Sequence, residues 1–145
     1  MTQQEKDLLL KDLCGRLPYG VKIALKNSVL YHHENVAKGD VTIDRLKGFT
    51  GSYFSIYHDN PLDWEWYEND IDVEDIKPYL FPLSSMTEEQ EIIYGDFVYG
   101  IVSSNPLETQ KRINELYDWL NKNHFDWRGL IPMGLANDAT GLNIY

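Results

Sequence analysis

The stretch TQQEKDLLLKDLCGRLPYGVKIALK, residues 2–26, decides the fold class because its hydrophobic period changes halfway along. The first half predicts a helix, since Thr2 and Glu5 have the spacing of a capping box, in which both side chains bond free backbone N–H groups. The apolar stripe of this helix follows at three- and four-residue spacing, with Leu8 at its flank, in Leu9, Leu10 and Leu13. Gly15 is expected to end the helix, and Pro18 forbids its continuation.

The second half of this stretch predicts a strand. From Val21 to Lys26, apolar residues alternate with lysines and one alanine, which is typical of a strand with one solvent-facing side. Gly48 and Gly51 are expected to mark a later connection. Further strands are predicted, from β-branched and aromatic runs between turn residues, at 29–36, 41–43, 53–57 and 62–67. About five short strands joined by short loops indicate an antiparallel sheet, either open or closed into a small, partly open barrel.

The segment after these strands is interrupted by proline. Asp72 can cap a short turn at its start. Pro78 and Pro82 then exclude a long helix, and we expect an ordered crossover loop over about 72–86.

Two helices are predicted after the crossover. Thr87 and Gln90 repeat the capping-box spacing and predict the start of a short helix. The run at 97–102 is β-branched and aromatic, so strand and helix both stay open there. The last helix opens with Asn105 as its cap and should run to about Lys122. Its apolar stripe comprises Ile113, Leu116, Tyr117 and Leu120, and an apolar cluster of Phe125, Trp127, Leu130 and Ile131 follows it.

The chain has 145 residues, a length typical of a single domain with one core. We predict one domain over 1–145, with a strand-rich part at about 21–68, the crossover at about 72–86 and a helical part at about 87–132. The predicted fold class is α+β. It comprises an N-terminal helix, an antiparallel sheet or small partly open barrel of about five short strands, and a mainly helical C-terminal half packed on the sheet.

The net charge of −10 is concentrated in one part of the chain. Residues 59–96 carry twelve acidic residues and a single basic one, Lys77, whereas residues 1–58 carry eight basic and six acidic residues. A field of this sign repels phosphate backbones, so direct nucleic-acid binding is disfavoured. A basic protein is the expected partner.

The sequence indicates neither export nor membrane insertion. Residues 1–13 are polar and charged where a signal peptide needs an apolar run, and no apolar run of transmembrane length occurs. The single cysteine, Cys14, excludes an internal disulfide. We therefore expect a cytoplasmic protein without a membrane segment.

Three stretches carry a resemblance to a known group of proteins. They are LCGRLPYGVK at Leu13–Lys22, IKPYLFPLSSMTEEQ at Ile76–Gln90 and DWLNKNHFDWRGLIPMGLA at Asp118–Ala136. Together they resemble small proteins of no assigned function from gut Bacteroidetes and from their phages or other mobile elements, whereas residues 27–70 have no counterpart. The resemblance implies a small intracellular protein of a bacterial or phage setting, and it carries over no activity, cofactor or site residue.

The chain lacks the sequence motifs of common catalytic and cofactor sites. It contains no phosphate-binding glycine loop, no serine-hydrolase elbow and no paired-cysteine zinc motif. Acids alternate from Glu68 to Glu74, as they do in calcium loops. An EF-hand loop that starts at Asp70 would need glycine and glutamate where Asp75 and Phe81 stand, so the pattern fails. No cofactor, metal ligand or catalytic residue is predicted.

Cysteine and histidine side chains lack a local catalytic signature as well. Cys14 follows the leucine stripe and is expected to be a buried, inert thiol rather than half of a dyad with His32, His33, His58 or His124. Neighbours on a strand point to opposite faces, so His32 and His33 are not expected to share a metal. His124 lies at a helix end, which suits a favourable interaction with the helix dipole.

The most unusual local feature is a group of aromatic residues beside the acidic run. Trp64 and Trp66 are expected to be the inward face of a strand, although a role at an interface stays open. Rigid aromatic area next to dense negative charge is typical of a surface that binds a basic protein. The residues predicted to form that surface are Asp63, Glu65, Tyr67, Asp70, Asp72, Glu74 and Asp75.

Two classes of function therefore compete. We expect a non-enzymatic intracellular interaction protein whose acidic, aromatic-flanked surface binds a basic protein partner. The alternative is a small-ligand-binding protein or an enzyme with a pocket between sheet and helices, in which His58 or His124 meets a carboxylate. A homo-oligomer with Trp64 and Trp66 at its interface is a third hypothesis.

Overall fold

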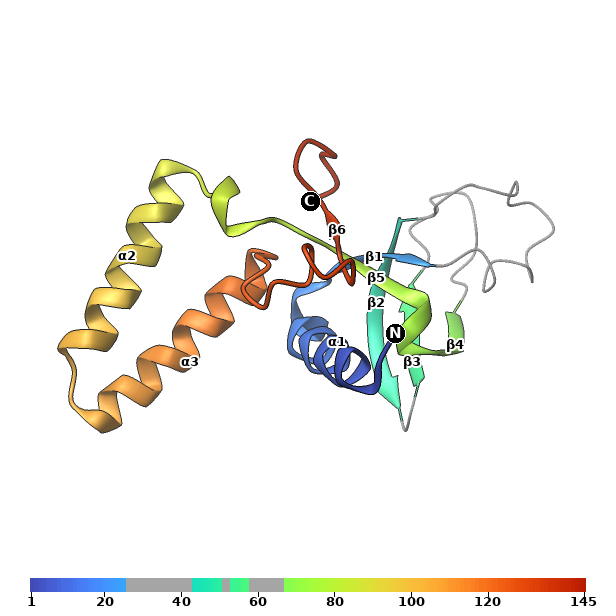
Figure 1. Cartoon of the computed structure of the whole chain (residues 1–145), viewed down its shortest axis with the longest axis horizontal. Helices are drawn as coiled ribbons and strands as arrows, with labels where there is room; N and C mark the ends of the chain where they lie inside the picture. Colours follow the sequence, from blue (N-terminus) through green and yellow to red (C-terminus); the bar gives the residue numbers. More distant parts are fainter. Residues whose placement is uncertain (26–42, 51–52, 58–66) are drawn as a thin grey trace.

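The computed structural model of the chain describes residues 1–25, 43–50, 53–57 and 67–145. It has an α+β fold, as predicted, with one helix before the sheet and two helices packed together after it (Figure 1). The helices are α1 (Gln3–Arg16), α2 (Glu88–Ser103) and α3 (Pro106–Lys122). The strands are β1 (Lys22–Leu25), β2 (Ile43–Thr50), β3 (Tyr53–Tyr57), β4 (Tyr67–Ile71), β5 (Ile76–Leu80) and β6 (Asn137–Asp138).

Helix α1 begins at the predicted capping box. The Thr2 hydroxyl accepts a hydrogen bond from the Glu5 backbone N–H at 3.2 Å, and the Thr2 N–H donates to the Glu5 carboxylate at 2.6 Å. The expected stop at Gly15 is wrong, because α1 runs on to Arg16 and into a 3₁₀ turn, η1 (Leu17–Tyr19). Pro18 fits this first turn, where no N–H is needed, and the chain reverses at Gly20 with φ of 63°.

The sheet is mixed rather than purely antiparallel. Its strand order is β4-β3-β2-β1-β5-β6, and every neighbouring pair is antiparallel except β5 and β6. The first four strands follow one another as a meander, and β5 returns to pair with the free side of β1. The predicted strands at 29–36 and at most of 41–43 and 62–67 lie outside the described residues.

Three expectations for the strands need correction. The strand near Val21 is confirmed as β1, but the side expected to face solvent is covered at Ala24, which packs in a second small cluster with Tyr79 and Ala139, while Lys22 on that side is partly exposed. Gly48 lies inside β2, where the register shifts, rather than in a connection, since glycine is well suited to a bulge. The strand predicted at 62–67 is described only at Tyr67, and β4 extends beyond its predicted end to Ile71.

Strand β5 stands where a crossover loop was expected. Only the short 3₁₀ turns η3 (Val73–Asp75) and η4 (Leu83–Ser85) flank it. Pro78 pairs with Ile23 of β1, while β6 on the other side pairs only with Tyr79 and Leu80. Proline has no backbone N–H to donate, and Pro78 is tolerated because β6 does not pair with this residue.

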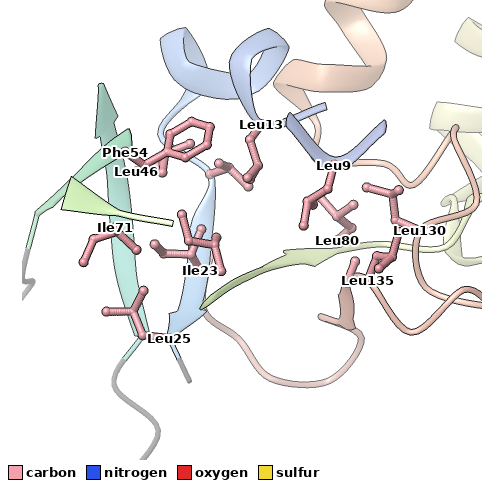
Figure 2. Packing of buried hydrophobic residues seen from close by; sticks show 13 residues of the cluster. Leu9, Leu13, Ile23, Leu25, Leu46, Phe54, Ile71, Leu80, Leu130 and Leu135 are labelled. Carbon is pink, nitrogen blue, oxygen red and sulfur yellow. The ribbon is translucent and has the colours of Figure 1, made fainter. Parts of the chain in front are cut away.

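Helix α1 covers the sheet and supplies its side of the main core. Leu9 and Leu13 point down onto Ile23, Phe54 and Leu80, and all five side chains are fully buried (Figure 2). Residues 130–136, which follow α3, close the other end of this core. No residue of α2 or α3 is among the buried members of this cluster.

Helices α2 and α3 instead form an antiparallel hairpin that projects away from the sheet (Figure 1). The prediction that the helical C-terminal half packs on the sheet is therefore wrong in its placement. Thr87 and Gln90 form the predicted capping box at the start of α2, and the open question at 97–102 is settled in favour of helix. Helix α3 begins at the Asn105 cap and ends at Lys122 as predicted.

Candidate functional site

Helix α2 exposes a row of large apolar side chains. Ile92 is 62% exposed, Tyr99 75% and Val102 80%, and Val98 is also exposed. At 3.6 residues per turn these side chains share one side of the helix. We define the α2 face as Glu88, Glu91, Ile92, Gly95, Val98, Tyr99 and Val102, which all lie on this side. Leu107, at the start of α3, is also exposed and lies five residues after Val102, the last residue of the α2 face.

The opposite side of α2 is occupied by the packing of the hairpin. Tyr94, Phe97 and Ile101 are partly buried there, against a cluster built on Leu116 and Leu120 of α3. The rings of Phe97 and Trp119 lie 6.0 Å apart. The hairpin thus has its own small core, and burying that core leaves the α2 face uncovered by the residues that the structure describes.

The charge of α2 has one sign. Glu88, Glu89, Glu91 and Asp96 are all exposed, and the helix contains no Lys, Arg or His. The three glutamates stand in the first turns, where negative charge also favours the helix dipole. Glu88 and Glu91 belong to the α2 face, whereas Glu89 and Asp96 lie beside it.

The base of the hairpin is fixed to the sheet by backbone hydrogen bonds. The Phe81 N–H donates to the His124 carbonyl at 2.9 Å, and the Asp126 N–H donates to the Phe81 carbonyl at 2.7 Å. Arg16 of α1 donates from Nη2 to the Phe125 carbonyl at 2.8 Å. These bonds hold the strand end before α2 and the segment after α3 at one place, so the hairpin leaves the body from a defined base.

A buried ion pair reinforces that base. Arg16 Nε and Nη2 donate to the two carboxylate oxygens of Asp12 at 2.7 and 3.1 Å, and both side chains are fully buried. Arg128 Nε lies 3.4 Å from Asp12 Oδ1, and its guanidinium lies 3.9 Å from the centre of the Trp127 ring. The Asp126 carboxylate accepts the N–H groups of Leu130 and Ile131 and orders the turn after α3.

The acidic surface predicted from the sequence falls only partly in the described residues. Asp63 and Glu65, like Trp64 and Trp66, lie outside them. Tyr67 and Asp70 stand in β4, the strand at the end of the sheet order. Three further members follow at η3: Asp72 is exposed, Asp75 is half-buried, and Glu74 forms an ion pair with Lys6 of α1 at 2.5 Å. Whether these seven residues form one binding surface stays a prediction.

The enzyme alternative would be favoured by a histidine beside a carboxylate. His124 is buried with φ of 58°, and its ring stacks on Tyr145 with the ring centres 3.9 Å apart. Burial, with a smaller contribution from the nearby Arg16 guanidinium, lowers the pKa of His124 to about 4. The imidazole is therefore neutral at pH 7, so the expected favourable interaction of a charged His124 with the helix dipole is wrong.

His124 has no general acid or base partner among the described residues. Its Nδ1 makes no hydrogen bond to them. Tyr145, on which it stacks, donates its hydroxyl to the Tyr79 carbonyl at 2.7 Å and accepts the Lys22 N–H at 2.9 Å. These contacts tie the end of the described chain to β1 and β5 and give His124 a packing role. His32, His33 and His58 lie outside the described residues.

Cys14 and the acidic residues are the other candidate ligands. Cys14 is half-buried against the main core, and burial raises the pKa of its thiol, which keeps it protonated. In the described ranges, no three His, Cys, Asp or Glu side chains gather in a way that could hold a metal ion. The same part of the chain contains no helix that is long and apolar enough to cross a membrane.

The α2 face was not predicted from the sequence, although the sequence contains a pattern that indicates it. The segment EEQEIIYGDFVYGIVS (Glu88–Ser103) is apolar on two sides once it is drawn as one uninterrupted helix. A helix that is apolar on two sides needs two partners. If 97–102 is a separate element, each of the two parts of this segment is apolar on one side and needs only one packing partner.

Comparison of the chain with protein-family models, with curated proteins and with solved structures gives no match.

Proposed function

We propose that this chain is a non-enzymatic interaction protein that binds a basic protein partner through the α2 face. The observation that carries the proposal is the exposure of Ile92, Tyr99 and Val102 along one side of a helix whose other side is packed. Contiguous exposed apolar area bordered by charge is typical of protein-binding surfaces. Tyrosine at the centre of such a surface offers a large contact area at a low cost in side-chain entropy.

The sign of the charge supports a basic partner. Glu88 and Glu91 lie on the α2 face, Glu89 and Asp96 beside it, and no basic residue of α2 offsets them. Residues 59–96 as a whole carry twelve acids against one lysine, so the six acidic residues of the surface predicted from the sequence add to the same field. A basic surface is attracted over this range, and association is fast at low salt.

The same charge argues against the other occupants. A second copy brings another net charge of −10 to the interface, and nucleic acid or an anionic lipid surface brings phosphates. Nucleic acid and an anionic lipid surface offer no cation to the exposed glutamates of α2, and the α2 helix of a second copy offers none either. A basic protein is the occupant that gains from both the apolar and the acidic parts of the α2 face.

The experiment that tests this proposal uses two double variants with equal charge. The immobilised chain captures proteins at low salt from a lysate of the cells that encode it, and each captured protein is purified. Its affinity is then measured for the wild type, for Glu88→Gln/Glu91→Gln on the α2 face, and for Glu89→Gln/Asp96→Asn beside it. We expect the first double variant to lose more affinity and to show a shallower salt dependence than the second.

Both double variants remove two negative charges from the same helix, so the second controls for net charge, and thermal unfolding of both variants checks that α2 stays folded. Equal losses in the two variants would show that only the overall field matters and would contradict binding at the α2 face. Failure to capture any basic protein at low salt would also contradict the proposal.

A further inference from the structure

We propose that the partner contributes an α-helix that crosses α2 at Gly95 and places its basic end over Glu88 and Glu91. This inference rests on the proposed function, because it concerns the same α2 face and specifies the segment that binds there.

Gly95 and Gly100 are both helical glycines, but only one of them is explained by this chain. A Cβ placed on Gly100 would lie 2.6 Å from Arg112 Nη1 of α3, so this glycine allows the hairpin to pack closely. A Cβ placed on Gly95 would meet nothing within 4 Å. Glycine inside a helix is destabilising relative to alanine, so an exposed glycine with free space has no benefit within the described chain.

Gly95 lies at the centre of the α2 face. Ile92 precedes it by three residues, and Val98, Tyr99 and Val102 follow it by three, four and seven. Residues at these spacings surround one another on a helix surface, so the four larger side chains form a rim around a low point at Gly95. A ridge of side chains from a second helix packs into such a low point, and the absence of a side chain lets the two backbones approach closely.

The backbone of α2 excludes strand addition at this surface. A partner strand needs unpaired backbone N–H and C=O groups along a sheet edge, whereas Gly95 and its neighbours lie in the interior of a continuous helix. Recognition of the α2 face must therefore rest on side chains. An amphipathic helix satisfies its own backbone groups and presents side chains at the matching spacing of three and four residues.

The charges give this helix a direction. Glu88 and Glu91 occupy the N-terminal end of the α2 face, while Val98 and Val102 at the other end are uncharged. Lysine or arginine residues of the partner are therefore expected at the end of its helix that lies over Glu88 and Glu91. The opposite end is expected to be apolar, to cover Val102.

Gly95→Ala tests the inference, because the two effects of this substitution are expected to have opposite signs. The free chain should become no less stable, since the added methyl has room. Affinity for the captured and purified partner should fall by roughly tenfold or more, because the methyl keeps the partner helix away from α2. Ile93→Ala changes an exposed apolar position of α2 that lies outside the α2 face, and it should leave the affinity unchanged.

Photo-crosslinking identifies the shape of the bound segment. A photoreactive side chain at Tyr99 or at Val102 should label residues of the partner that recur at three- and four-residue spacing, which is typical of a helix face. Labels at every second residue would indicate an extended segment and would overturn the inference. Labels on a second copy of this chain would overturn it as well.

The outcomes also separate this inference from the proposed function. If Val102→Asp abolishes binding but Gly95→Ala leaves the affinity unchanged, the α2 face binds the partner and the crossing at Gly95 is wrong. If neither substitution changes the affinity, the partner binds elsewhere and both proposals fail.

Discussion

At the scale of single residues, the most consequential feature is the buried pair of Asp12 and Arg16. Both side chains have no exposed surface, and Arg16 also donates to the Phe125 carbonyl at the base of the hairpin. A buried charge is tolerated only with its partner and its hydrogen bonds in place. The pair therefore fixes α1 to the segment after α3, and its loss is expected to loosen the base of the hairpin.

Removing one member of this pair should cost far more than removing both. Asp12→Ala leaves Arg16 buried without its carboxylate, which is expected to lower the free energy of unfolding by about 3–5 kcal/mol. In the double variant Asp12→Leu/Arg16→Met the uncompensated charge is gone, and most of that stability should return. Urea unfolding of the single and double variants measures the difference, and additive losses would show that the two side chains are not coupled.

His124 predicts how stability depends on pH. Its pKa is lowered from 6.5 to about 4, first by burial and then by the Arg16 guanidinium, while Tyr145 faces it as an uncharged ring. The unfolded chain binds a proton below pH 6.5 and the folded chain does not until about pH 4, so stability falls as the pH falls between these values. The loss should reach about 3 kcal/mol at most, and less where water reaches the ring.

His124→Phe isolates this contribution, because it keeps a ring against Tyr145 and cannot take up a proton. Between pH 7 and pH 5 the variant should lose less stability than the wild type in urea or thermal unfolding. Identical pH dependence in the two proteins would mean that His124 is not the group responsible.

At the scale of elements, the two glycines of α2 predict opposite responses of stability. Gly95→Ala has room for its methyl and should stabilise the chain by about 0.5–1 kcal/mol, since alanine is the better helix former. Gly100→Ala meets the guanidinium of Arg112, which must move away from the hairpin contact, so its gain should be smaller or negative. Thermal unfolding of the two variants checks the order, and a larger gain at Gly100 would contradict the packing described for the hairpin.

The starts of the helices could be predicted from the sequence because their causes are local. Thr2, Thr87 and Asn105 cap their helices through side-chain bonds to a backbone N–H three residues on, and such bonds need nothing beyond the helix itself. Strand β5 could not be predicted in this way. Pro78 argues for a loop locally, and only the pairing with β1, together with the short reach of β6, makes it acceptable in a strand.

The α2 face could not be predicted from the sequence, because it too depends on a tertiary contact. Which side of α2 is free depends on where α3 packs, and the contact of Tyr94, Phe97 and Ile101 with α3 is tertiary. The sequence did locate the region of highest negative charge, residues 59–96, and α2 begins inside it. The regional net charge could thus be predicted from the sequence, whereas the exposed side of α2 could not.

At the scale of the whole molecule, the hairpin projects from a body in which α1 covers the sheet (Figure 1). Its base is held by the bonds of Phe81 and Arg16, so the α2 face stands clear of the main core. A partner can therefore cover α2 without rearrangement of the described core. The charge of the whole chain then acts at a distance to favour basic partners.

This arrangement predicts that the chain does not associate with itself through α2. With a net charge of −10 on each copy, the chain should sediment with the mass of a single chain at micromolar concentration and moderate salt. Analytical ultracentrifugation measures the mass. A dimer that dissociates in Val102→Asp would show that the α2 face serves a second copy instead of a basic partner.

The central claim, that the α2 face is the binding surface, is tested most directly by one comparison of affinities. Val102→Asp places a charge at an exposed position of the α2 face, and Met133→Asp places the same charge at an exposed apolar position outside the hairpin. If the partner binds the α2 face, its affinity falls at least roughly tenfold in Val102→Asp and stays unchanged in Met133→Asp, with both variants folded. Equal affinity in Val102→Asp and the wild type would contradict it.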